Sequence, residues 1–231
     1  AAWWLSLRKV KRGGPIPEAA VEDLIFYGAM GVVLGGRFGY VIFYNFERFL
    51  EDPLWLFRIW EGGMSFHGGL LGVLVALALY ARKLKLDPFV VYDFIAPVVP
   101  IGLGLGRIGN FIGQELWGRA SDVPWAMVFP ADPAQLARHP SQLYQALLEG
   151  LMLFVVLQVY ASKPRPAPAV GGVFLTGYGI FRFAVEFVRE PDNHIGFDAF
   201  GWMTRGQILC VPMILIGIAL IFWAYRRQQV K

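Results

Sequence analysis

The fold is decided by runs of apolar residues that leave no polar face. Residues 214–221 read ILIGIALI, and residues 73–79 read VLVALAL. Strands of a membrane barrel would alternate polar and apolar residues, whereas a helix that is apolar all round lies in a large core or in a bilayer. These stretches therefore predict buried α-helices.

The composition identifies lipid as the surroundings of these helices. The chain has 231 residues, of which 56% are hydrophobic and 16% are charged, against about 25% charged in an ordinary soluble domain. Cys210 is the only cysteine, which excludes an intrachain disulfide and a Cys-rich metal site. Apolar runs long enough to cross a bilayer lie at about 21–46, 64–81, 89–112, 143–161, 170–188 and 206–225. The sequence predicts an all-α polytopic membrane protein, a single integral membrane domain over residues 1–231 with six transmembrane helices.

The basic residues alternate between connections, which predicts the orientation. Twelve of the 21 lie within residues 8–12, 82–85, 163–165 and 226–231, which the positive-inside rule places in the cytoplasm beside anionic membrane lipids. The other connections, 47–63, 113–142 and 189–205, contain no lysine and are expected to face outward. This distribution needs no nucleic-acid partner, despite a net charge of +4.

Two further segments carry expectations about architecture. Residues 113–142 form the longest connection and are rich in aromatic residues and proline, which predicts a small outer-facing cap that could shelter a site. Residues 1–7 precede the first basic cluster and read as the remnant of an additional N-terminal helix. The chain is therefore interpreted as a fragment of a longer protein.

The nine remaining basic residues are all arginines, and three of them lie inside predicted spans. Arg37, Arg107 and Arg182 each would cost about 2.5–3.5 kcal/mol at the centre of a membrane helix, so each must face protein, water or a bound anion. Arginine without lysine favours bidentate recognition of phosphate or carboxylate. A phospholipid headgroup is the nearest such ligand.

Spacing and depth suggest that these groups share one outward-opening pocket. Arg182, Glu186 and Arg189 stand at i, i+4 and i+7 on one helix face, and Arg107 and Asn110 are i, i+3 neighbours. The arginines in the spans and the glycine-flanked His67 map to the outer half of the membrane. Glu149 and Asp93 also lie in spans, and neither is assigned a chemical role.

Structural alternatives stand beside these hypotheses. Arg37 could pair with an acidic residue, and Arg182 with Glu186, simply to fix helix register. The glycines around Arg107 allow close approach by either a ligand or another helix. His67 could be an interfacial histidine without a chemical role, and His139 could cap the next helix together with Ser141. The three histidines form a poor metal signature, so neither a metal nor a cofactor is expected.

Several sequence blocks resemble the bacterial phosphatidylglycerol:prolipoprotein diacylglyceryl transferase family. The most specific block is Gly106-Arg107-Ile108-Gly109-Asn110-Phe111-Ile112, followed by Glu115-Leu116-Trp117-Gly118-Arg119. Similar blocks, in the same order as in the family, occupy residues 62–69, 93–97, 138–144 and 178–182, and the resemblance extends from about residue 3 to 227. The chain therefore resembles members of this family along almost its whole length.

The resemblance implies a transfer reaction at the outer face of the bacterial inner membrane. The family moves the sn-1,2-diacylglyceryl group of phosphatidylglycerol to the lipobox cysteine of a prolipoprotein signal peptide, which forms a thioether and releases glycerol phosphate. The positions carried over as essential or supporting are His67, Arg107, Asn110, Gly118, Glu115, Tyr178, Arg182 and Glu186.

The expected roles follow the charges of this reaction. Arg107 and Arg182 grip the phosphate, His67 or alternatively His139 accepts the thiol proton, and Asn110 and Tyr178 orient the headgroup. Glu115 and Glu186 orient the arginines. A transporter or flippase for an anionic lipid or solute is the competing class, although no internal repeat supports it.

This chain departs from the family pattern in two places. Gly113-Gln114 stands where family members usually read Asn-Gly, so the setting of the following carboxylate, Glu115, is expected to differ. The family also begins with a membrane helix that bears a functional tyrosine motif, and only the last turns of that helix are recognised in residues 1–7.

Overall fold

A computed structural model describes residues 2–11, 13–190 and 203–229. The described residues are mostly helical and fall into two compact units, Trp3–Phe94 and Ile95–Lys231. Four segments are long and apolar enough to cross a membrane: Ala20–Tyr44, Pro88–Ile112, Ser141–Tyr160 and Arg205–Gln229. The expected spans at 64–81 and 170–188 are also helical but do not belong to this set; the second is a shorter apolar helix.

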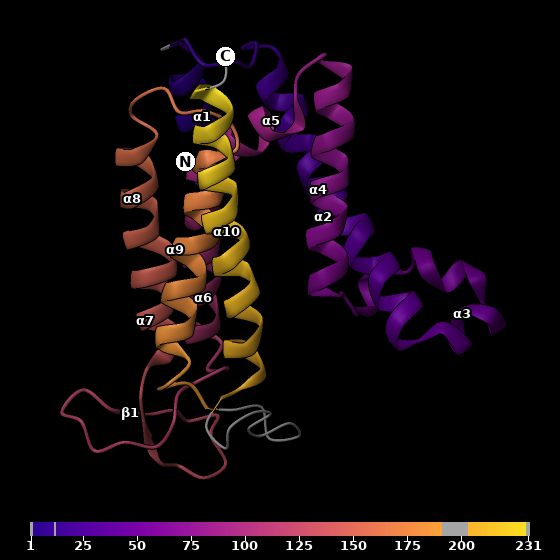
Figure 1. Ribbon diagram of the computed structural model, residues 1–231. Helices are drawn as coiled ribbons and strands as arrows, with labels where there is room; N and C mark the ends of the chain where they lie inside the picture. Colours follow the sequence, from indigo (N-terminus) through magenta and orange to yellow (C-terminus); the bar gives the residue numbers. More distant parts are fainter. Residues whose placement is uncertain (1, 12, 191–202, 230–231) are drawn as a thin grey trace. The chain divides into compact units, whose positions relative to one another are not determined.

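The N-terminal unit is built around two long helices. Its elements are α1 (Ala2–Lys11), α2 (Ala20–Tyr44), α3 (Phe46–Glu51), η1 (Pro53–Phe57), η2 (Ile59–Glu61), α4 (Phe66–Lys83) and α5 (Pro88–Ile95). Helices α2 and α4 run antiparallel, side by side (Figure 1). A Cβ added at Gly31 would lie 2.6 Å from the carbonyl oxygen of Gly72, and one at Gly39 would lie 2.8 Å from the Cα of Gly68. Glycine therefore sets the close approach of these helices.

The start of α4 is fixed by Ser65. Its backbone N–H donates to the carbonyl oxygen of Gly36 at 2.9 Å, and its hydroxyl oxygen accepts from the backbone N–H of Gly68 at 3.2 Å. The first bond ties the helix to α2, and the second satisfies one of the free N–H groups of the first turn. His67 is thereby placed in that first turn.

The C-terminal unit is a helical bundle that carries one irregular connection. Its elements are η3 (Ala96–Val98), α6 (Val99–Ile112), β1 (Met127–Val128), β2 (Ala137–Arg138), α7 (Ser141–Gln145), η4 (Ala146–Met152), α8 (Leu153–Tyr160), α9 (Ala169–Val185) and α10 (Arg205–Gln229). Helix α6 packs on η4, and α9 packs along α10 (Figure 1). A Cβ added at Gly150 would meet the Cα of Gly104 at 2.7 Å, so small residues again bring backbones together.

Residues 141–160 form one continuous helix whose middle, η4, is wound as a π-helix. Such wide turns are rare and occur frequently at functional sites. A buried cluster of Ala96, Leu153, Leu157 and Val170 packs beside this segment. On α10, by contrast, side chains such as Leu215 and Phe222, each 61% exposed, point outward, as expected of a helix that contacts lipid.

The connection 113–142 is folded rather than extended. Strands β1 and β2 pair antiparallel with Met127 opposite Arg138, and Gly118 forms a bridge with Arg189. The carboxylate of Asp132 accepts from Nε of Arg138 at 2.6 Å, and both side chains are buried. This arginine holds the pKa of Asp132 below its ordinary value. The pair therefore anchors the centre of the connection at neutral pH.

Candidate active site

Arg107 pairs with a buried carboxylate to which the sequence analysis gave no chemical role, and Arg182 lies close enough to act on it electrostatically. The Nη2 atom of Arg107, on α6, lies 3.6 Å from Oε2 of Glu149, on η4. Glu149 is completely buried and also interacts electrostatically with Arg182, on α9. This contact was not foreseen from the sequence, and the position of Glu149 inside a membrane span was the available signal.

The stripe expected along the end of α9 is present. The Nη2 atom of Arg182 lies 2.8 Å from Oε2 of Glu186, and Nη1 of Arg189 lies 3.6 Å from Oε1 of the same carboxylate. The hydroxyl of Thr204 donates to that oxygen at 3.0 Å. A Cβ at Gly206 would meet it at 2.7 Å. Glu186 is thus enclosed and holds one edge of the Arg182 guanidinium group.

Tyr178 lies one turn before Arg182 on α9. It is close enough to Glu149, Arg182 and Arg107 to interact with their charges, and its ring stacks on Phe174 with centroids 6.1 Å apart. Tyr178, Arg182 and Arg107, all residues of the predicted site, therefore lie near Glu149. A phenol in this place can donate a hydrogen bond to an anion held by the arginines.

Asn110 and Glu115 interact with each other at the end of α6. The amide of Asn110 donates to Oε1 of Glu115 at 2.6 Å, and the backbone carbonyl of Glu115 accepts from Gln142 at 2.8 Å. The role expected of Glu115, orienting an arginine, stays a prediction. The contact that the structure gives its carboxylate is with the Asn110 amide at the end of α6.

The structure shows how the chain accommodates Gly113-Gln114 in place of the Asn-Gly usual in the family. Gln114 has a φ of 54°, in the left-handed region that favours glycine, so a glycine at this position is the less strained choice. Here the Oε1 atom of Gln114 accepts from the backbone N–H of Ala131 at 2.9 Å. The side chain therefore ties the beginning of the connection to its middle, in partial compensation for the strain.

Gly118 has a packing role that the sequence did not reveal. An added Cβ would lie 2.5 Å from the carbonyl oxygen of Val188 and 2.7 Å from both the Cβ and the carbonyl oxygen of His139. Its N–H donates to that His139 carbonyl at 2.9 Å, and its own carbonyl accepts from Arg138 at 3.4 Å. Gly118 is therefore enclosed between two backbone segments, and only glycine fits.

The sequence left two roles open for the glycines around Arg107, close approach by a ligand or close approach by another helix. A Cβ at Gly104 would lie 3.1 Å from the Cα of Gly150, so Gly104 serves helix packing. At Gly102, Gly106 and Gly109 an added Cβ meets no atom of the described chain within 4 Å. These three glycines lie on one exposed face of α6, roughly opposite the Gly104 side that packs on η4.

Arg37 belongs to the N-terminal unit and serves its structure. It is 2% exposed and donates to backbone carbonyls, through Nε to Leu56 at 2.9 Å and through Nη2 to Trp55 at 2.6 Å, with Nη1 bonded to Gly62. The structural reading is confirmed, but the expected acidic partner was wrong. Carbonyl oxygens of residues 55–63 satisfy this guanidinium group instead.

The two candidate histidines differ in their surroundings. His67 is exposed in the first turn of α4 and contacts the ring of Phe66 edge to face. His139 does not cap the next helix: the N-cap residue is Pro140, and Nδ1 of His139 lies 3.1 Å from the hydroxyl of Tyr144. Because Trp125 can only donate, its 2.6 Å bond to that hydroxyl leaves the hydroxyl proton for His139.

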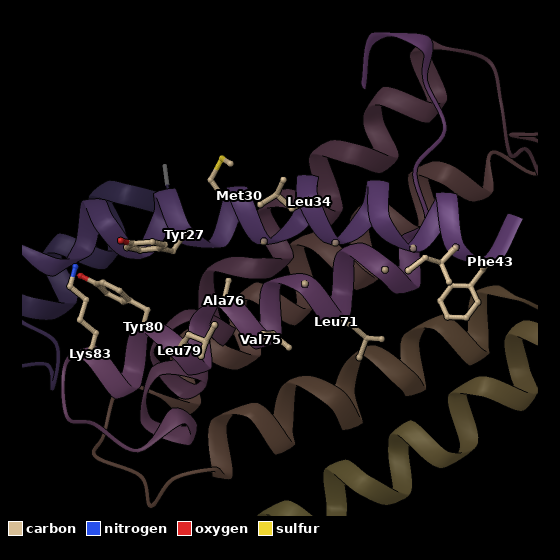
Figure 2. Close-up of a pocket in the computed structure, with 16 residues that line it drawn as sticks. Tyr27, Met30, Leu34, Phe43, Leu71, Val75, Ala76, Leu79, Tyr80 and Lys83 are labelled. Carbon is tan, nitrogen blue, oxygen red and sulfur yellow. The ribbon is translucent and has the colours of Figure 1, made fainter. Parts of the chain in front are cut away.

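An apolar groove of about 600 Å³ also runs along α2 and α4 in the N-terminal unit (Figure 2). Tyr27, Tyr80 and Lys83 stand at one end of it, and Phe43 stands toward the other. Its lining contains none of the site residues expected from the sequence. The groove is therefore lined by residues of the N-terminal unit alone.

Fixed cations in an apolar bundle indicate the chemistry that the site can perform. Arg107 is 21% exposed and Arg182 is 14% exposed, so their guanidinium groups are largely withdrawn from water, where charges interact more strongly than at a surface. Together the fold and the site define a helical membrane protein with a cluster of largely buried arginines.

Comparison with known proteins assigns the family. The model of the family described as "Prolipoprotein diacylglyceryl transferase" matches residues 1–223. A protein of Teredinibacter turnerae is 70% identical over 91% of this chain and 73% of its own length. Proteins of Methylococcus capsulatus and Pseudomonas aeruginosa are 60% and 57% identical over 99% and 100% of this chain and 88% and 86% of their own lengths. All three are named phosphatidylglycerol--prolipoprotein diacylglyceryl transferase. The chain belongs to the prolipoprotein diacylglyceryl transferase family.

Proposed function

We propose that this chain transfers the sn-1,2-diacylglyceryl group of phosphatidylglycerol to the lipobox cysteine of a prolipoprotein. The cysteine sulfur forms a bond to the glycerol carbon, the bond from that carbon to the phosphate oxygen breaks, and glycerol phosphate leaves with the electron pair. The observation that carries the proposal is the ion pair between Arg107 and the buried Glu149, beside which Arg182, from a second helix, is close enough to interact electrostatically. Family membership supports the same reaction.

The arginines act on the charge of the phosphate. Arg107 and Arg182 bind the phosphodiester and stabilise the second negative charge that develops as the carbon to oxygen bond breaks. Glu186 holds Nη2 of Arg182 at 2.8 Å and so fixes the plane of its guanidinium group. Tyr178 donates to the same anion. Arginine suits this task because its donors are planar and paired.

The thiol must lose its proton before it attacks. A cysteine thiol has a pKa of about 8.5, so a base or a positive field is needed at neutral pH. His67 is the proposed acceptor, because it is exposed and histidine is the side chain that changes charge near neutral pH. The bond of His139 to Tyr144 occupies Nδ1 and makes His139 the weaker candidate.

Asn110 and Gly118 act through the connection that follows α6. Asn110, held by Glu115, orients the headgroup, and Gly118 allows the backbone to pass between His139 and Val188. The proposed arrangement in the bacterial inner membrane has six crossings, with residues 113–142 as an outer-facing cap and the site open to the periplasmic side. Residues 1–231 then act as a single membrane domain.

A reconstituted assay separates this function from its alternatives. Detergent-solubilised protein is incubated with labelled phosphatidylglycerol and a lipobox peptide, and the peptide is examined for the thioether product by mass spectrometry. Thioether formation that is lost with Arg107→Lys supports the transferase. Uptake of a labelled anionic lipid or solute into vesicles without thioether product would favour a transporter, and absence of both signals would refute the proposal.

A further inference from the structure

One face of the helix 141–160 buries a set of polar groups that the proposed roles do not use. Gln142, Gln145 and Glu149 are all 0% exposed. Neither oxygen of Glu149, neither polar atom of the Gln145 side chain, nor Oε1 of Gln142 has a hydrogen-bond partner in the described chain. Burying such groups without partners is costly, and most native proteins avoid it. These atoms are therefore available to a bound molecule that supplies hydrogen-bond partners.

The cluster adjoins the anion site directly. Nη2 of Arg107 lies 3.6 Å from Oε2 of Glu149. The charge of Arg182 acts on the same carboxylate, and the side chain of Gln145 lies within hydrogen-bonding reach of it. The Nη1 atom of Arg182 is buried and likewise forms no hydrogen bond within the described ranges, although Nη2 binds Glu186. A ligand whose phosphate reaches the arginines therefore brings its next few atoms to Glu149 and Gln145.

The unpaired atoms specify what this ligand must carry. The oxygens of Glu149 accept hydrogen bonds, whereas Nε2 of Gln145 and Nη1 of Arg182 donate them. A phosphodiester supplies only acceptors, and an ammonium headgroup supplies only donors. A hydroxyl group supplies both, and two neighbouring hydroxyl groups can satisfy the carboxylate and the amide together.

We propose that Glu149 and Gln145 recognise the two hydroxyl groups of the terminal glycerol of phosphatidylglycerol, beside the phosphate held by Arg107 and Arg182. This inference rests on the proposed function and assigns the residues that select the headgroup. A site built to hydrogen-bond a hydroxyl discriminates against a ligand that lacks it, because its own buried groups are then left unpaired. Other headgroups are rejected for the same reason.

The test compares two lipids that differ only in these hydroxyl groups. Phosphatidylpropanol has the same three-carbon headgroup and the same phosphate as phosphatidylglycerol, and both lipids would yield the same modified lipobox peptide. We expect the wild-type protein to prefer phosphatidylglycerol by about 10-fold or more in kcat/KM. Gln145→Met removes two unpaired polar atoms and should fold normally, yet it should lower this preference by about 5- to 10-fold. Glu149→Gln should lower it as well.

Matched variants exclude a general loss of activity. Gln158→Met removes an amide on α8 that donates to the carbonyl of Pro97 at 3.1 Å, and it should leave the preference unchanged. Arg107→Lys should slow transfer from both lipids in the same proportion. If Gln145→Met or Glu149→Gln also slowed transfer from both lipids in the same proportion, Glu149 would only position Arg107. The inference would then be overturned.

The remaining outcomes separate this inference from the function. Equal use of both lipids by the wild-type protein would refute hydroxyl recognition and leave the transferase intact. No transfer from either lipid would refute the function, and hydroxyl recognition would then be judged by lipid-dependent melting temperature in detergent. Hydroxyl recognition would be supported if phosphatidylglycerol raised the melting temperature more than phosphatidylpropanol does and if Gln145→Met abolished this difference. Equal increases in melting temperature with the two lipids would overturn it.

Discussion

The sharpest test of the site concerns Gly118, one of the positions that the family resemblance carries over as essential or supporting. Gly118→Ala places a methyl group 2.5 Å from the carbonyl oxygen of Val188 and 2.7 Å from backbone and Cβ atoms of His139. None of these atoms lies at the far end of a flexible side chain. The two backbone segments must therefore move apart, which breaks the arrangement around the residue.

The magnitude follows from the contacts that are lost. Overpacking of this kind costs about 1–3 kcal/mol. Separation of the segments also breaks the bond from Gly118 N–H to the His139 carbonyl and the bond from Arg119 N–H to the Val188 carbonyl, each 2.9 Å long and each worth about 1 kcal/mol. The variant should lose about 3–5 kcal/mol of stability in this part of the protein.

Thermal unfolding in detergent and limited proteolysis within residues 113–142 measure this loss, and the thioether assay reports activity. The matched control is Gly102→Ala, where the added Cβ meets no described atom within 4 Å and the melting temperature should stay the same or rise. A Gly118→Ala protein with the melting temperature and protease resistance of the wild type but without activity would refute the packing role.

Three further predictions test separate residues. Arg107→Lys should reduce kcat/KM by about 100-fold or more with little change in melting temperature, because paired donors are lost while the charge stays; normal turnover would contradict the phosphate grip. Arg37→Gln should cost about 3 kcal/mol in unfolding experiments through lost bonds to buried carbonyls, so a stable but inactive variant would contradict its structural role. The pKa of Asp132 is lowered by Arg138, so their stabilisation is present at neutral pH and is lost as the pH falls below about 4. Protease resistance of residues 113–142 should fall over that range in the wild type and be low at every pH in Asp132→Asn; a pH-independent wild type would contradict this.

The roles of individual charges could be predicted only where their partners are close in the sequence. The ion pair of Arg182 with Glu186 was predictable, because an i, i+4 spacing brings two side chains together on any helix. The partner of Arg107 was not, because Glu149 is 42 positions away along the chain and reaches it only through the packing of α6 on η4. The same reason explains why the carbonyl partners of Arg37 were missed.

The sequence by itself determined the class of protein and the segments that carry it. Apolar periodicity and composition depend on local residues and on the solvent around them, so the helices and their lipid surroundings could be inferred without coordinates. The tertiary structure alone decided that Glu149 pairs with Arg107, that Asn110 is bound by Glu115 and that Gly118 lies between two backbone segments. Each of these is a contact between residues brought together by packing, and the geometry of packing is not encoded in any local pattern.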